Sequence, residues 1–367
     1  MESLTRLRTH ADTATTLALL SDRDLTELVA SGTPVGTGIG GRTTLLEVDG
    51  VTVFVKRVPL TDTELHPDHI RSTANIFDLP PYCHYGIGAI GSPGFGAWRE
   101  LATHEMTTNW VRTGRFSGFP LLHHWRVLPD AQQSLPEQLV DAERAVAYWS
   151  GGRARIEALR TASTSQALFL EYQPYTVHDW FHEQLRSDDA DSACALVEQG
   201  LETVIDFLQR HQLVHFDAHF RNILTDGQQL YLADYGLALS GRFELAPPER
   251  DFYDSHRRYD RAYALSYLVH WLIVDQYGLA RDARQDFIRA CADGRRPEGI
   301  PGAAAALISR HARLAAVVGD FNRRLEQESR LTPYPHDDVD ALSSNVVSAG
   351  SSTMSSPRAS TLGSSGK

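Results

Sequence analysis

The period of the hydrophobic pattern changes near residue 33. Before that point, Leu25, Leu28 and Val29 recur at the spacing of one helix face. Ser21 precedes them, and Asp24 follows three positions after Ser21, which is a helix-capping signal. The pattern predicts a short helix that begins after Ser21, and we expect residues 1–32 to form an N-terminal helical extension.

Two β-rich runs then flank the dipeptide Asp49-Gly50, a strong signal for a two-residue hairpin turn. Side chains alternate between the two faces of a strand. The valines of the second run, residues 51–55, therefore share one face, and Lys56 lies on the other face at the strand end. The sequence thus predicts a hairpin that turns Lys56 away from its valine face.

The rest of the chain mixes helical and strand-like segments, interrupted by two irregular stretches at about 57–97 and 128–166. The expected elements are a helix at 98–111, strands at 119–127 and 167–172, a helical centre at 142–159, an amphipathic helix at 193–212, short strands at 222–224 and 230–233, and mainly helices to about 330. This order predicts an α+β fold with a β-rich first half and a helical second half.

Composition narrows the class of protein. The 367 residues carry a formal charge of −11, which disfavours a general nucleic-acid-binding role because phosphate neutralisation needs a basic field. The three cysteines are far apart, so we expect a reducing, cytoplasmic setting rather than a disulfide framework. The most apolar later run, 262–280, contains His270 and Asp275 and predicts a buried helix, not a membrane span.

The end of the chain is rich in serine. Residues 341–367 contain ten Ser and two Thr with almost no apolar periodicity. Such a segment cannot bury enough surface to offset its ordering entropy, so we predict a disordered tail.

A glycine pattern precedes the hairpin. Gly36, Gly38 and Gly41 fit G-x-G-x-x-G. A loop without Cβ atoms lets backbone N–H groups approach phosphates, and Lys56 nearby supplies a positive charge. A Rossmann interpretation is disfavoured because strands follow the motif instead of a helix. A second match at 86–91 has no such context, and we interpret it as a flexible loop.

The strongest constellation contains His215, Asp217, His219 and Asn222, followed by an Asp-Tyr-Gly triplet that begins at Asp234. Phosphoryl transfer needs a group that accepts the proton of the substrate hydroxyl, as Asp217 can, and oxygen ligands for Mg²⁺, as Asn222 and Asp234 can provide. Two alternatives remain open: a pair of turn histidines, or a zinc site, since H-x-D-x-H is rich in ligands.

Along the chain, a glycine loop, a strand lysine, a helix glutamate, an H-x-D loop with a later Asn and an Asp-Tyr-Gly triplet follow one another. In this order of motifs the chain resembles the protein-kinase-like superfamily. The intervals of five residues from Asp217 to Asn222 and of 17 to Asp234 resemble the spacing of that family. The resemblance implies that the glycine loop and Lys56 contact the phosphates of ATP. It also implies that Asp217 is the catalytic base and that Asn222 and Asp234 bind Mg²⁺.

The resemblance implies a bilobal kinase-like fold. A small β-rich N-lobe would span 33–175, with the irregular stretches near 57–97 and 128–166 as insertions. A larger, mainly helical C-lobe would span 176–335.

Three further roles follow from the same resemblance. Of Glu100 and Glu105 on the helix at 98–111, we favour Glu105 as the partner of Lys56. Residues 168–174 resemble the hinge strand whose backbone holds adenine, which puts Glu171 and Gln173 among the nucleotide-binding residues. Residues 246–249 and Asp260 resemble conserved structural elements of protein kinases, and we expect them to be structural.

The class of acceptor stays open at this point. We count His219 among the catalytic residues. A histidine two positions after the aspartate at 217 resembles the catalytic loop of aminoglycoside and choline phosphotransferases. The glycine loop, the strand lysine and the Ala-Pro-Pro-Glu segment at 246–249 resemble Ser/Thr protein kinases, which we favour. A protein or small-molecule hydroxyl would accept the phosphate. A third possibility, a pseudokinase that only binds partners, would require the loss of a motif residue, and none is missing.

Overall fold

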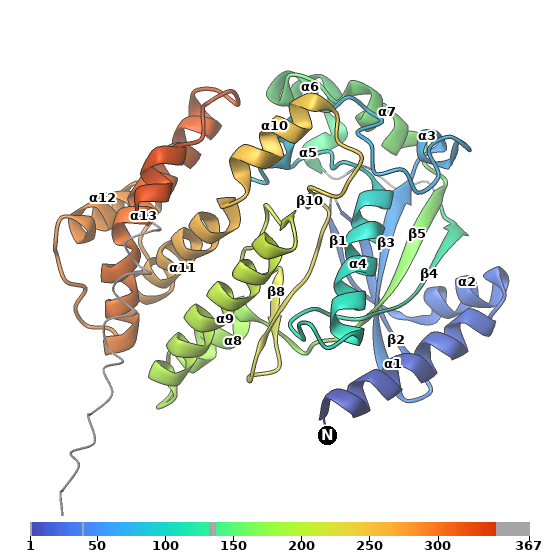
Figure 1. The fold of residues 1–367 in the computed structure, drawn as a ribbon, viewed down its shortest axis with the longest axis horizontal. Helices are drawn as coiled ribbons and strands as arrows, with labels where there is room; N and C mark the ends of the chain where they lie inside the picture. Colours follow the sequence, from blue (N-terminus) through green and yellow to red (C-terminus); the bar gives the residue numbers. More distant parts are fainter. Residues whose placement is uncertain (1, 39, 132–134, 136, 343–367) are drawn as a thin grey trace, which may run out of the picture.

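The computed structural model describes residues 2–38, 40–131, 135 and 137–342. The fold is α+β, as predicted, and is built around an antiparallel five-stranded sheet in the order β1-β2-β3-β5-β4 (Figure 1). Its strands are β1 (Thr33–Gly38), β2 (Gly41–Val48), β3 (Val51–Leu60), β4 (Leu122–Pro129) and β5 (Thr164–Glu171).

The predicted hairpin joins β2 to β3. Asp49 and Gly50 both have positive φ, 51° and 78°, as a tight turn between twisted strands requires. Val53 and Val55 are fully buried against α1 (Glu2–Leu19) and α2 (Asp22–Ser31), while Lys56 lies on the opposite face. The prediction for the two faces of this strand is therefore confirmed.

The two faces of the sheet carry different helices. Helix α2 starts at the predicted cap, where the Ser21 hydroxyl accepts the N–H of Asp24. Helix α4 (Ala97–Arg112) covers the other face, where Trp98 and Leu101 pack on Leu168 of β5. The sheet is thus held between an N-terminal layer and the helix that carries Glu100.

The second half is mainly helical and contains the largest hydrophobic cluster (Figure 1). Its helices are α8 (Val177–Gln184), α9 (Ala190–Arg210), α10 (Pro247–His256), α11 (Tyr259–Tyr277), α12 (Arg281–Ala292) and α13 (Gly302–Gln327). Its short strands are β6 (Tyr175–Thr176), β7 (Leu213–Val214), β8 (Ile223–Thr225), β9 (Leu230–Leu232) and β10 (Leu239–Ser240). Within the described part of the chain, no helix has the length and apolar character needed to cross a membrane.

The two irregular stretches pack against each other. They contain α3 (Asp62–Leu65), η1 (Pro81–His84), α5 (Glu137–Val140), α6 (Ala142–Trp149) and α7 (Arg153–Thr161). The single helical centre expected at 142–159 is two helices, because Ser150 and Gly152 adopt left-handed φ values of 50° and 82° between them. Phe77 and Ile90 of the first stretch share a core with Trp149 of the second. We call residues 61–96 and 137–162 together the insert layer.

A buried glutamate ties the insert layer to the sheet. Glu64 forms a capping box with Thr61, accepts the N–H of Ala97 at the start of α4 (2.7 Å), and pairs with Arg155 of α7 (2.6 Å). Both charged side chains of the pair are almost fully buried. One carboxylate therefore joins both insertions to the first residue of α4.

Of the predicted tail, Ala341 and Leu342 are helical and end the described chain. The remainder of the predicted disordered segment, 343–367, lies outside the described residues.

Replacing Arg155 by Met should destabilise the fold by about 3–5 kcal/mol, because it leaves the Glu64 carboxylate buried without its cation. The matched control is Arg153→Met on the same helix, since Arg153 pairs with Glu143 at the surface and should leave the unfolding midpoint almost unchanged. Urea unfolding of both variants measures the difference. Equal midpoints would show that the buried pair does not hold the insert layer.

Candidate active site

Lys56 lies between two carboxylates. Its Nζ is 2.7 Å from Oε1 of Glu100 and 2.9 Å from Oδ1 of Asp234. The side chains of Lys56 and Glu100 are 7% and 3% exposed, whereas that of Asp234 is 44% exposed. The ammonium is therefore buried on the Glu100 side, and Asp234 opens toward the surrounding cavities.

The prediction that Glu105 partners Lys56 is wrong. Glu105 instead pairs with Arg71 at 2.5 Å, at a partly exposed position. Five residues along a helix correspond to a rotation of about 140°, so only one of the two glutamates can face the lysine. The contacts of α4 with Glu64 and the sheet turn Glu100 inward.

The charges in this cluster stabilise one another. Burial opposes the charge of Lys56, but the carboxylates of Asp234 and Glu100 outweigh it and raise the pKa of Lys56 above its ordinary value. Burial likewise opposes ionisation of Asp234, yet the ammonium of Lys56 lowers the pKa of Asp234 well below its ordinary value. Both groups are thus charged at neutral pH.

Asp217 lies on a loop with a fixed backbone. Asp260 of α11 accepts the N–H of His215 (2.6 Å) and that of Phe216 (2.9 Å), and Phe216 has a positive φ of 65°. The Asn222 amide donates to Oδ2 and to the carbonyl oxygen of Asp217, both at 3.0 Å. These bonds support the structural role expected of Asp260 and hold the Asp217 carboxylate in place.

The Asp217 carboxyl is poised near neutrality. Burial raises the pKa of Asp217 to about 7, and the negative charge of Asp234 adds to the rise against the hydrogen bond from Asn222. A carboxyl with such a pKa can accept a proton during a reaction and release it afterwards at physiological pH.

The two histidines of this loop have different surroundings. His215 is buried with its Nε2 2.9 Å from the carbonyl oxygen of Ala233, and burial lowers its pKa to about 4. His219 is partly exposed, with its Nε2 3.7 Å from Oδ2 of Asp217. In the described part of the chain no three His, Cys, Asp or Glu side chains gather as metal ligands would, so the zinc alternative gains no support.

A cavity of about 350 Å³ lies between the sheet and the loops that carry Asn222 and Asp234. Its apolar lining includes Val35, Leu45, Phe54, Leu170 and Leu224. Its polar lining includes Lys56, Glu171, Gln173, Asn222 and Asp234, all of which the sequence placed at the candidate site.

The predicted glycine loop lies beside this cavity. Gly36 and Gly38 are in β1, and Gly41 begins β2. Gly41 has a φ of 122°, and a Cβ atom there would lie 2.1 Å from the carbonyl oxygen of Arg57, so no side chain fits. A Cβ on Gly40 would lie 3.1 Å from Nζ of Lys56, which places this turn directly over the lysine.

Two contacts at the site have no signal in the sequence. Arg6 of α1 binds both carboxylate oxygens of Glu171, at 2.7 Å each, and also donates to the carbonyl oxygen of Phe119. The Glu171 carboxylate further accepts the N–H of Leu121, so only its backbone is left for a ligand. The N-terminal helix thereby fixes the strand that edges the cavity.

The second contact involves the glycine pattern at 86–91. A Cβ on Gly86 would lie 2.9 Å from Oδ1 of Asp217, so this segment lies against that carboxylate. Arg330 holds it there by donating to the carbonyl oxygens of Ile87 (2.7 Å) and Tyr85 (3.4 Å). The interpretation as a loop is confirmed, but its position at the site was not predicted.

The donor set fits a magnesium ion. Asn222 and Asp234 line the same cavity, and Mg²⁺ prefers oxygen ligands. The Asn222 amide nitrogen is bound to Asp217, which turns its amide oxygen away from that carboxylate. The carboxyl groups of Glu100, Asp217 and Asp234 lie near the ammonium of Lys56, and a further positive charge beside them would favour the ionised form of Asp217.

Comparisons with models of known protein families and with curated proteins gave no match.

Asp217→Asn should change the pH dependence of stability. A carboxyl whose folded pKa is raised stabilises the protein below the unfolded pKa, near 4, and this contribution disappears as the pH rises through about 7. The variant lacks this loss, so its free energy of unfolding relative to wild type should increase between pH 5 and pH 8. Urea unfolding at both pH values measures the difference.

The control is Asp188→Asn, an exposed aspartate outside this loop, measured under the same conditions. If the difference between Asp217→Asn and wild type does not change with pH, the Asp217 carboxyl is not perturbed in the way described.

Proposed function

We propose that the protein is an ATP- and Mg²⁺-dependent phosphotransferase that moves the γ-phosphate of ATP to a hydroxyl. The observation that carries the proposal is the convergence of Lys56, Asp217, Asn222 and Asp234 around one region of the fold. These residues come from three separate places in the chain: strand β3, the loop that carries Asp217 and Asn222, and the loop after β9. A kinase-like reaction requires them together, and a binding module that has lost catalysis does not.

The proposed kinase-like architecture assigns the sheet with α4 to a small lobe and the helical second half to a large lobe. In support, the cavity of about 350 Å³ is lined by the sheet on one side and by residues 222–234 on the other. ATP would bind here, with its adenine at the backbone of residues 171–173 and its phosphates near Lys56. The apolar lining suits a flat base.

Each polar residue then has a role in phosphoryl transfer. The acceptor oxygen attacks the γ-phosphorus, the bond from that phosphorus to the β–γ bridging oxygen breaks, and Asp217 receives the hydroxyl proton. Asn222 and Asp234 would hold Mg²⁺, which neutralises phosphate charge when bound. Glu100 acts through Lys56 and is a positioning residue.

A small-molecule acceptor is favoured over a protein by the surroundings of Asp217. Gly86 lies against the carboxylate, and Arg330 anchors that segment. A peptide chain would need open surface in front of Asp217, whereas a small hydroxyl compound can enter beside the segment. The Ser/Thr protein kinase that the sequence favoured is supported by its motifs alone.

Turnover with γ-labelled ATP and Mg²⁺ tests the proposal, using cell lysate, aminoglycosides, amino alcohols and hydroxylated anions as acceptors. Asp217→Asn should lower kcat by about 10²–10⁴-fold while ATP affinity stays within about twofold, because the base acts on the acceptor. Calorimetric titration with ATP and Mg²⁺ measures that affinity. Unchanged kcat in Asp217→Asn would refute its role.

The two glutamates of α4 offer a matched comparison. Glu100→Gln removes a carboxylate from Lys56 and should lower kcat by about tenfold or more, a barrier change of about 1.4 kcal/mol. Glu105→Gln, which removes a carboxylate paired with Arg71 and not with Lys56, should leave kcat within about twofold. Equal effects of the two substitutions would contradict the pairing as a requirement for catalysis.

A further inference from the structure

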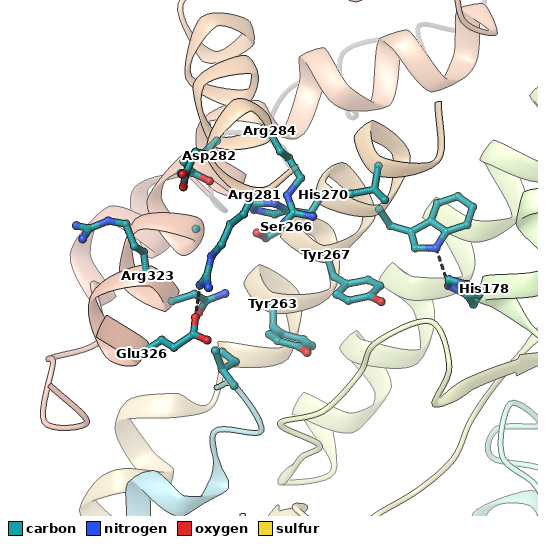
Figure 2. Close-up of a pocket in the computed structure, with 16 residues that line it drawn as sticks. His178, Tyr263, Ser266, Tyr267, His270, Arg281, Asp282, Arg284, Arg323 and Glu326 are labelled. Atoms are coloured by element: carbon teal, nitrogen blue, oxygen red, sulfur yellow. Dashed lines mark hydrogen bonds and ion pairs between the residues drawn. The ribbon is translucent and has the colours of Figure 1, made fainter. Parts of the chain in front are cut away.

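A second, larger cavity lies among the helices of the second half. It has a volume of about 530 Å³ and is formed mainly by α11, α12 and α13 (Figure 2). Nothing in the motifs of the chain accounts for it. Its size is in the range of cavities that hold small ligands.

This cavity borders the catalytic loop on two sides. The ring of Tyr267 in its wall lies 6.1 Å from the ring of His219 and 5.1 Å from that of Phe220. Ile87, which also lines it, follows Gly86, the residue that contacts Asp217. Asp217 itself lines a neighbouring cavity of about 330 Å³ together with Gly86 and Asp234. Burial nevertheless raises the pKa values of Tyr263 and Tyr267 in the wall of the larger cavity, and the charge of Asp217 adds to that rise, so a ligand there would lie beside the residues that surround the proposed base.

The charges around the cavity are mostly positive. Three arginines and two carboxylates, Asp282 and Glu326, line it. Figure 2 shows the arginines gathered on one side, with the two tyrosines on the other, and Arg281 reaching Glu326. Arg323 has its own surface partners, Glu328 at 2.9 Å and Asp320 at 3.7 Å.

Arg284 differs from the other two arginines of the cavity, which pair with carboxylates. Among the described residues its guanidinium has no ion-pair or hydrogen-bond partner, although its Nε is buried. Burial and the nearby positive charge of Arg281 lower the pKa of Arg284, but an arginine stays protonated in proteins. The guanidinium is partly buried without a counter-charge from the described part of the chain, so the position favours an anion beside it.

Two other polar atoms in the same cavity lack partners in the described structure. They are Nε2 of His270 and Oδ1 of Asn322, both buried. Buried polar atoms in native proteins are nearly always hydrogen-bonded to protein, water or ligand. Tyr263, Tyr267 and Trp271 supply apolar surface beside them, so the cavity combines a flat wall with unsatisfied polar groups.

We propose that this cavity is the acceptor site, and that its ligand is a small hydroxyl-bearing oxyanion, a carboxylate or a phosphate ester, whose anionic group binds Arg284 while a hydroxyl faces Asp217. This inference rests on the proposed phosphotransferase function. In the reaction the acceptor oxygen forms a bond to the γ-phosphorus of ATP, ADP leaves with the electron pair of the broken bond, and Asp217 takes the hydroxyl proton.

The experiment uses four hexoses that differ in one group. Glucuronate carries a carboxylate, glucose 6-phosphate a phosphate, glucosamine a cation, and glucose no charge. Binding of each sugar is measured by calorimetry on the full chain in the presence of ADP and Mg²⁺, so that no transfer takes place. Turnover is measured separately as the release of ADP from ATP. Comparison of the two anionic sugars distinguishes a carboxylate from a phosphate ester.

At least one of the two anions should bind the wild-type protein roughly 10- to 100-fold more tightly than glucose or glucosamine. Arg284→Gln should reduce this preference to less than about threefold and raise KM for the anion more than it lowers kcat. Arg289→Gln, an exposed arginine on the same helix, should leave the preference unchanged. ADP binding should be unaffected in both variants.

Equal or tighter binding of glucose or glucosamine, binding of none of the four sugars, or an unchanged preference in Arg284→Gln would overturn the inference. If another acceptor is phosphorylated in an Asp217-dependent way, the proposed function would still stand. If instead an anion binds through Arg284 but no labelled phosphate reaches any acceptor, both the acceptor role and the proposed function are wrong.

Discussion

The burial of the Lys56 ammonium between Glu100 and Asp234 is the interaction on which the rest of the structure depends. Burying charges costs several kcal/mol for each ion unless the geometry is close to ideal. Strand β3, helix α4 and the loop that follows β9 must therefore keep their relative positions to within a fraction of an ångström. The sheet supplies one of these positions through the valine face that packs on α1 and α2. The other two depend on the insert layer and on the helical second half.

The insert layer connects the parts of the candidate site. Glu64 accepts the first N–H group of α4 and so sets the position of the helix that presents Glu100, one turn later. At its other end the same layer places Gly86 against Asp217 and is held to the segment after α13 by Arg330. Asp217 itself lines a cavity of about 330 Å³ together with Gly86 and Arg155 of the insert layer and with Glu100 and Asp234. Residues of both insertions line this cavity, so the two insertions act as one structural element beside Asp217.

Features that depend on a few neighbouring residues could be predicted from the sequence. The Ser21 cap, the Asp49-Gly50 turn and the face of Lys56 follow from backbone geometry within a few residues, and each is confirmed. The choice between Glu100 and Glu105 depends instead on the rotation of α4 about its axis, which distant contacts determine. The same holds for the Arg6–Glu171 pair, whose members are 165 positions apart, and for Gly86 at Asp217. Spacing along the chain carries no information about such contacts.

The overall negative charge of the chain affects how it can bind anionic ligands. A protein with a formal charge of −11 repels ATP and an anionic acceptor alike at long range. Beyond a distance of about 8 Å this repulsion is largely screened at physiological ionic strength, whereas buried charges are screened much less. The proposed binding of ATP and of an anionic acceptor therefore requires cations inside the cavities. Lys56 lines the cavity proposed for ATP, and Arg284 lines the cavity proposed for the acceptor. In the proposed reaction, anions that come close to Asp217 would raise its pKa further, whereas Mg²⁺ and the ammonium of Lys56 oppose that rise and keep the carboxylate available to accept a proton at neutral pH.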